Sequence, residues 1–164
     1  MNAQGEHDLG FACVTQQTMP NREICTGMRL PNGITTTIAQ MHDWKWQDGA
    51  PVQEGHYHKG LMERCIVLTG WMLYVTSVVP AGYTACVAEK GEMVTFYTND
   101  HHLVLLGPET VIQTTAYGSP VGNPKRKGID WWPSGEYYNV VRLDELSLDW
   151  ARECRRIDRH RDCC

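Results

Sequence analysis

Apolar and polar residues alternate in short runs along the middle of the chain, with glycine or proline between the runs. The runs lie at 34–41, 66–68, 71–79, 83–89, 93–97, 103–106 and 110–117. Short alternating or β-branched runs of this kind predict β-strands, and a spacing of about eight to twelve residues is typical of sandwiches and barrels. No helical period alternates with the runs. The pattern predicts one all-β domain, a jelly-roll β-barrel.

The segments on either side of these runs differ from them in composition and periodicity. Residues 1–32 have mixed polarity and few periodic signals, so we expect them to wrap the outside of the barrel or to pair at a sheet edge. Residues 119–140 are rich in glycine and proline and contain Lys125-Arg126-Lys127, Trp131-Trp132 and Tyr137-Tyr138. A long irregular segment with large aromatics is often a lid or a binding loop. The basic triplet is either a solvated turn or a binding site for an acidic substrate or partner.

A helical period returns near the C-terminus. Leu146, Trp150, Cys154 and Ile157 recur at three- and four-residue intervals, and Ser147 is a suitable cap. We therefore predict a C-terminal helix over residues 147–160 that packs on the barrel exterior or on a second subunit.

Composition narrows the class of protein. The 164 residues suffice for one domain, 1–164, and the net charge of −4 without a basic stripe argues against nucleic-acid binding. No apolar run approaches the roughly 18 residues of a membrane span, and the N-terminus resembles no secretory signal, so we expect a cytoplasmic protein with no membrane partner. The seven cysteines follow no zinc-finger spacing. Cys65 is expected to pack in the core or to approach the site described next.

Candidate chemistry gathers at two histidine clusters. His56 and His58 are one residue apart, and Glu63 follows in the next strand-like run. Alternate residues of a strand point to one face about 7 Å apart, so two imidazoles can converge on one target. His101-His102 offers a further imidazole from another run. Inward-facing imidazoles and a carboxylate are typical of a mononuclear metal centre with open positions, whereas a lone His-x-His also occurs by chance on surfaces.

These residues also carry a family resemblance. The motif His56-x-His58-x4-Glu63-x6-Gly70 resembles the first signature of the cupin superfamily. The stretch Gly91-x5-Tyr97-x-Asn99-x2-His102 resembles the second, with Tyr97 and Asn99 in place of a proline and a glycine, and Leu106 in place of a final asparagine. The resemblance covers residues 33–118, the expected barrel core. It implies the metal ligands His56, His58, Glu63 and His102, with His101 as the fourth ligand if the register shifts by one residue.

The resemblance implies a metal-dependent enzyme with a small-molecule substrate, an oxidoreductase such as a dioxygenase. Its cofactor would be a divalent Fe, Zn, Ni or Mn ion held partly by Glu63, and its assembly a homodimer. Two alternatives stay open. One is an isomerase, epimerase or lyase with His58 or His102 as the base and Tyr74 or Tyr137 as the acid. The other is a non-catalytic ligand-binding or accessory protein.

Overall fold

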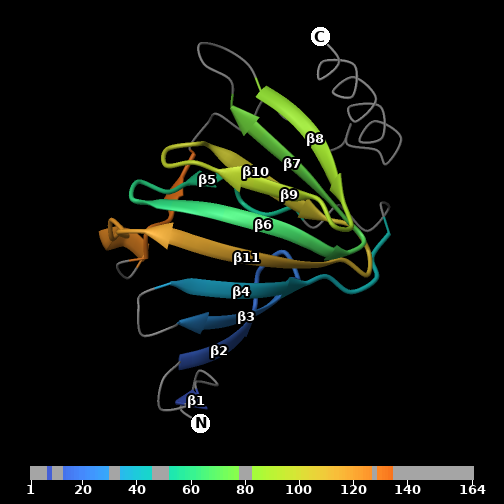
Figure 1. Cartoon of the computed structure of the whole chain (residues 1–164), viewed down its shortest axis with the longest axis horizontal. Coiled ribbons are helices and arrows are strands. Elements are labelled where there is room, and N and C mark those ends of the chain that lie inside the picture. Colours follow the sequence, from blue (N-terminus) through green and yellow to red (C-terminus); the bar gives the residue numbers. More distant parts are fainter. Residues whose placement is uncertain are drawn as a thin grey trace.

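Antiparallel strand pairing dominates the part of the chain that the structure describes. The structure is a computed structural model, and it describes residues 7–8, 13–29, 34–45, 52–77, 83–126 and 129–134. These residues form two antiparallel sheets, which Figure 1 shows in the colours of the sequence. The predicted all-β jelly roll is confirmed.

The larger sheet has seven strands in the order β1-β2-β3-β4-β11-β6-β9. Their bounds are His7–Asp8 (β1), Cys13–Thr18 (β2), Ile24–Arg29 (β3), Thr35–Gln40 (β4), Val111–Gly118 (β11), Leu61–Thr69 (β6) and Met93–Phe96 (β9). Strands β2 and β3 continue the sheet beyond β4, which is one of the two placements that the sequence allows for residues 1–32.

The smaller sheet has five strands in the order β12-β5-β10-β7-β8. Their bounds are Trp132–Pro133 (β12), His56–Tyr57 (β5), His102–Leu106 (β10), Trp71–Ser77 (β7) and Tyr83–Glu89 (β8). A short 3-10 helix, η2, covers Pro124–Arg126 in the loop before β12. The loop of residues 119–140 thus contributes an edge strand that pairs with β5.

The hydrophobic core lies between the inward faces of the two sheets. On β6, Cys65 and Val67 are buried while Ile66 between them is only half-buried, as the two-residue period of a strand requires. Strand β10 is buried along its whole length, and its continuous run Leu103–Leu106 suits a central strand that is covered on both faces. These two strands carry two of the candidate ligands, Glu63 and His102.

Gly70 makes the turn by which the chain leaves β6 for β7. Its φ of +73° lies in the left-handed region, and a Cβ there would stand 2.2 Å from the Thr110 hydroxyl. That hydroxyl bonds both the N–H and the C=O of Trp71, at 3.1 Å each. The last residue of the first motif therefore carries the chain from one sheet to the other.

Two predictions concern residues outside the described ranges. The C-terminal helix over 147–160 and the position of Tyr137 lie beyond residue 134. Within the described ranges, no helix is long and apolar enough to cross a membrane.

Candidate metal centre

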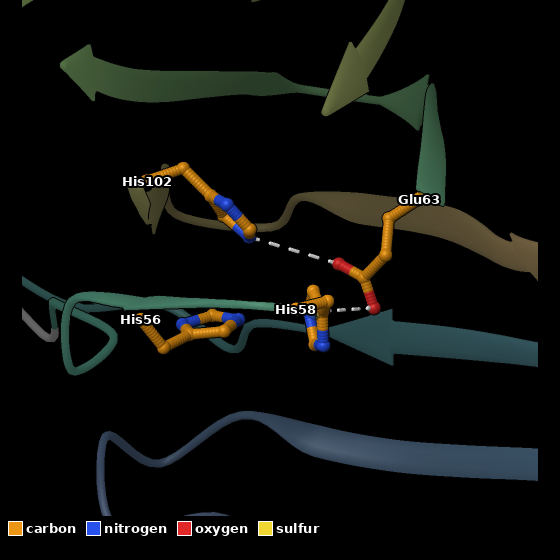
Figure 2. A group of neighbouring side chains, drawn as sticks. All are labelled: His56, His58, Glu63 and His102. Carbon is orange, nitrogen blue, oxygen red and sulfur yellow. Dashed lines mark ion pairs between the residues drawn. The ribbon is translucent and has the colours of Figure 1, made fainter. Parts of the chain in front are cut away.

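Three imidazoles meet where β5 pairs with β10. His56 stands directly opposite His102 in this pairing, and their ring centroids lie 4.4 Å apart. His58 follows two residues after His56, with its ring centroid 5.1 Å from that of His56 and 5.7 Å from that of His102. All three rings are buried. Figure 2 shows the rings gathered on one side of Glu63, which approaches from β6.

Each ring is fixed by a hydrogen bond from its Nδ1 to a main-chain carbonyl. His56 bonds the carbonyl of Glu54 and His102 that of Asp100, each at 2.9 Å, while His58 bonds the carbonyl of Asp130. Because a carbonyl can only accept, Nδ1 must carry the hydrogen in all three rings. Each neutral imidazole then presents the lone pair of Nε2 to the space between the rings.

The Glu63 carboxylate faces two of these lone pairs. Its oxygens lie 3.4 Å from His58 Nε2 and 3.8 Å from His102 Nε2 (Figure 2), which is too long for good hydrogen bonds. His58 Nε2 is buried and has no hydrogen-bond partner. Four acceptors therefore converge with no donor among them, and such a group is satisfied only by protons or by a cation.

Charge and burial shift the pKa values of His56, His58 and Glu63 in different directions. Burial, aided by His102, lowers the pKa of His56 to about 3, so His56 is neutral in the physiological range. Burial opposes ionisation of Glu63, but His102 and His58 outweigh it and hold the pKa of that carboxyl well below its usual range. Burial also lowers the pKa of His58, but Glu63 outweighs it and the net shift is upward. A proton shared by His58 and Glu63 thus competes with a cation, and acid should weaken metal binding.

The geometry fits a divalent metal ion. One ligand atom from each of His56, His58, Glu63 and His102 lies within 4.8 Å of the others. Metal–nitrogen bonds of about 2.1 Å place opposite ligands about 4.2 Å apart, so small side-chain movements would close the group around an ion. Three imidazole nitrogens and one carboxylate suit the borderline divalent metals. The group could therefore hold a metal.

The loop before β12 supports this centre. The Asp130 carbonyl orients His58, and the Trp131 ring stacks on His56 with centroids 5.0 Å apart. The Asp130 carboxylate accepts the N–H groups of Lys59 and Gly60 at 3.0 and 2.8 Å. A Cβ on Gly60 would stand 1.9 Å from the carbonyl oxygen of Ser119, so only glycine permits this close approach of the loop. Asp130 locks the loop to the turn that follows His58.

We expect Asp130→Ala to destabilise the protein and to weaken metal binding. Loss of the hydrogen bonds that main-chain N–H groups donate to this buried carboxylate should lower the free energy of unfolding by roughly 2–4 kcal/mol. Loss of the support behind His58 should reduce metal affinity by about 10- to 100-fold. Urea unfolding and competition against a chelator measure the two effects.

The matched control is Glu92→Ala. The Glu92 carboxylate also accepts a main-chain N–H, that of Glu89 at 2.6 Å, but on an exposed turn. This variant should leave metal affinity unchanged. Equal losses of affinity in both variants would show that Asp130 has no particular role at the centre.

A pocket of about 170 Å³ opens beside the four groups. Its lining includes all four candidate ligands together with Glu23, Cys25 and Cys65. Glu23 is 2% exposed, and burial raises its pKa to about 7 although a hydrogen bond from Asn21 opposes the shift. Burial raises the pKa of Cys65 to about 12, so that side chain is a neutral thiol that bonds Thr114 at 3.3 Å. Cys65 belongs both to the core and to the pocket wall.

The other predicted site residues lie elsewhere. His101 points away from the centre: its ring stacks on Tyr57 with centroids 4.3 Å apart, and its Nδ1 contacts the Ser134 hydroxyl at 3.2 Å. Tyr74 packs against Phe96 with centroids 6.0 Å apart and is not among the described residues that line the pocket. His102 rather than His101 therefore faces the other imidazoles.

Two residues of the site carry no clear signal in the sequence. Asp130 precedes Trp131-Trp132 in a loop that attracts attention only through its aromatic and basic residues. Glu23 lies in a segment with little periodicity, and only its two-residue spacing from Cys25 places both on one strand face. Both reach the centre through contacts distant in sequence.

Asn99 explains one departure from the second motif. Its φ of +66° lies in the left-handed region, which asparagine tolerates better than most non-glycine residues. The Asn99 N–H donates to the carbonyl of His58 at 2.7 Å. Asparagine can therefore make the turn that precedes His102 where the resemblance has glycine.

Comparison with known proteins finds likeness in structure alone. No protein-family model matches the sequence, and no curated protein matches it. Among solved structures, Bacillus subtilis oxalate decarboxylase, in a study of its Mn(II) centres, matches 71% of this chain at 11% identity and a TM-score of 0.54. The same enzyme at pH 4.6 matches 85% of the chain at 11% identity and a TM-score of 0.51.

A structure of Drosophila melanogaster CENP-C bound to CAL1 matches 65% of this chain and 80% of its own at 9% identity and a TM-score of 0.51. The chain spans about a third of the oxalate decarboxylase chain, with 30% and 32% covered in the two structures. At these identities the likeness concerns the fold.

Proposed function

We propose that the group of three histidines and one glutamate binds a divalent metal ion. Because the chain has the cupin fold, we further propose that the metal-loaded protein is an enzyme acting on a small molecule. The observation that carries the proposal is the convergence of three buried imidazoles and the half-buried Glu63 carboxylate, four acceptors without a donor among them. A structural role alone would not require a pocket beside the ion, whereas about 170 Å³ lies next to these side chains.

When bound, such an ion supplies Lewis-acid polarisation of a substrate oxygen or, if it is redox-active, a site for chemistry with dioxygen. The chain's own residues would hold the ion and balance its charge. His56, His58 and His102 would hold the ion through Nε2, and Glu63 would neutralise one of its charges. Trp131 stacks against His56 and would hold that ring in place. We favour an oxidoreductase with a substrate that bears a carbonyl or carboxylate. Mn is among the candidate ions, since the oxalate decarboxylase with the same fold has Mn(II) centres.

Glu23 favours a second candidate, an isomerase or lyase that moves a proton. Its carboxyl lines the same pocket, and with a pKa of about 7 it can give or take a proton near neutral pH. In this reading Glu23 replaces the tyrosines Tyr74 and Tyr137 that the sequence suggests as acids. A Glu23→Gln protein that binds metal normally but loses turnover and its pH dependence would favour this candidate.

The function is tested first by metal content. Protein purified without added metal is expected to contain about one equivalent of Fe, Mn, Zn or Ni by elemental analysis. Glu63→Gln should bind the metal at least about 10-fold more weakly, because it removes the single anionic ligand while keeping its shape. The loaded and metal-free proteins are then screened against small carboxylic acids and carbonyl compounds for oxygen uptake, carbon dioxide release or isomerisation.

Failure to bind any of these ions, or equal affinity in Glu63→Gln, would contradict the metal centre. Stoichiometric metal that raises thermal stability, without turnover of any compound, would instead favour a non-catalytic binding role.

A further inference from the structure

A second cavity of about 670 Å³ lies next to the metal pocket, and we call it the outer cleft. Its lining comes from three segments: the end of β2 with the turn after it, the stretch before β5 and the loop around η2. The lining residues are Gln17, Met19, Pro20, Asn21, Val52, Gln53, Glu54, Lys125, Arg126, Ile129 and Trp131. Its volume is typical of cavities that hold small organic ligands.

The outer cleft and the metal pocket share part of their walls. Met19, Gln53 and Trp131 line both cavities. Trp131 stacks on His56 of the metal centre, and the Arg126 guanidinium lies 4.2 Å from its ring centroid. A molecule in the outer cleft would therefore lie against the side chains that border the metal centre.

The chemistry of the outer cleft suits an apolar group. Met19, Pro20, Val52, Ile129 and Trp131 supply its apolar surface, and the Ile129 side chain is 64% exposed. An exposed isoleucine within a concave apolar surface is stabilised by any apolar ligand that covers it. Arg126 is already engaged, because its Nη2 lies 3.1 Å from a Glu54 carboxylate oxygen. The two cations Lys125 and Arg126 and the single carboxylate of Glu54 leave one positive charge among the lining side chains.

We propose that the outer cleft binds the apolar tail of a substrate whose small polar head reaches the metal pocket. The inference rests on the proposed metal-dependent function and adds a substrate class to it: a carboxylic or carbonyl compound with an aliphatic or aromatic tail. The metal pocket, about 170 Å³, accommodates only the head, and the larger cleft accommodates the tail.

Hydroxamic acids of increasing chain length test the proposal, because the head group chelates metal ions and the tail can be varied alone. Binding of acetohydroxamate and octanohydroxamate to the Zn-loaded full chain is measured by calorimetry. Each buried methylene should tighten binding by up to about fourfold. We expect octanohydroxamate to bind at least about 50-fold more tightly than acetohydroxamate.

Two variants locate the tail. Ile129→Asp places a charge in the outer cleft and should remove most of the gain from the longer chain, with acetohydroxamate binding unchanged. The matched control is Val121→Asp on the same loop, whose side chain is 45% exposed and does not line the cleft. It should preserve the gain.

The outcomes separate the two proposals. If acetohydroxamate binds but the longer chain adds nothing, or if the gain survives in Ile129→Asp, the cleft is not the tail site and this inference is overturned alone. If acetohydroxamate fails to bind the loaded protein, the open metal centre is overturned, and the tail site with it.

Discussion

Replacing His102 by glutamine is expected to lower metal affinity by at least about 100-fold. The reason lies in the ring geometry: the His102 Nδ1 bonds the carbonyl of Asp100, so Nε2 is the nitrogen that faces the other ligands. Glutamine keeps much of the side-chain volume but offers a neutral amide oxygen, a weaker ligand than an imidazole for borderline metals. The loss should exceed the 10- to 100-fold loss of metal affinity that follows removal of a hydrogen-bond partner of a metal ligand. Competition against a chelator gives the affinity.

The neighbouring histidine provides the control. His101→Gln changes an imidazole one position away whose ring stacks on Tyr57 and turns from the centre. It should bind metal as the parent does, and added metal should raise its melting temperature as in the parent, since binding to the folded state alone stabilises it. His102→Gln should show no such rise.

Retained affinity in His102→Gln together with loss in His101→Gln would mean that the strand register differs by one residue and that the described centre is incorrect. Urea unfolding of both metal-free variants shows whether each is folded. This check is needed because His102 is 1% exposed and stacks on Phe96 with centroids 4.0 Å apart.

The second large effect concerns the pH dependence of stability through Glu23. Its pKa is about 7 in the folded protein against an ordinary value of 4.5. Below pH 4.5 the carboxyl is protonated in both the folded and the unfolded protein, so it places no buried charge in the folded state. As the pH rises toward 7, the unfolded chain loses the proton first, so stability falls. Above 7 the folded state carries the full cost of a buried charge, about 3 kcal/mol.

Glu23→Gln removes this titration, since glutamine is neutral at every pH. In chelator-treated protein, its free energy of unfolding relative to the parent should rise between pH 4.5 and 8 by about 3 kcal/mol. Urea unfolding at a series of pH values measures the difference. A bound cation would stabilise a nearby carboxylate, so the same series with metal should show a smaller gain.

Glu54→Gln is the control for this series. The Glu54 side chain is 61% exposed, and its ion pair with Arg126 contributes less than about 1 kcal/mol. Its stability difference from the parent should vary little with pH. If Glu23→Gln and Glu54→Gln follow the same curve, Glu23 titrates as an ordinary carboxyl.

The sequence predicts the strands well because their signals are local. The strand expected at 83–89 matches β8, and the strand expected at 93–97 differs from β9 by one residue. Apolar alternation and glycine turns determine these elements, and both are readable from neighbouring residues. The jelly roll follows from the number and spacing of the strands.

The centre depends more on distant contacts, which the sequence does not display. Alternation along one strand predicts that His56 and His58 share a face, yet β5 ends at Tyr57 and His58 lies beyond it. His58 faces inward because its Nδ1 bonds the Asp130 carbonyl. The choice of His102 over His101 follows from the pairing of β10 with β5 and β7. Glu23 reaches the pocket because β3 joins the sheet beside β4.

The hydrogen bond between His58 and Asp130, 72 residues apart, has a consequence for biosynthesis. Hairpins such as β7–β8 join segments close in sequence and can form early, whereas this contact requires synthesis to have passed residue 130. On an emerging polypeptide, His56 and His58 would form a flexible chelator. Its affinities for divalent metals would follow the Irving–Williams order, in which copper binds most tightly. Discrimination among ions is therefore expected only after the loop has docked, so the cation is best delivered once the His58–Asp130 contact has formed.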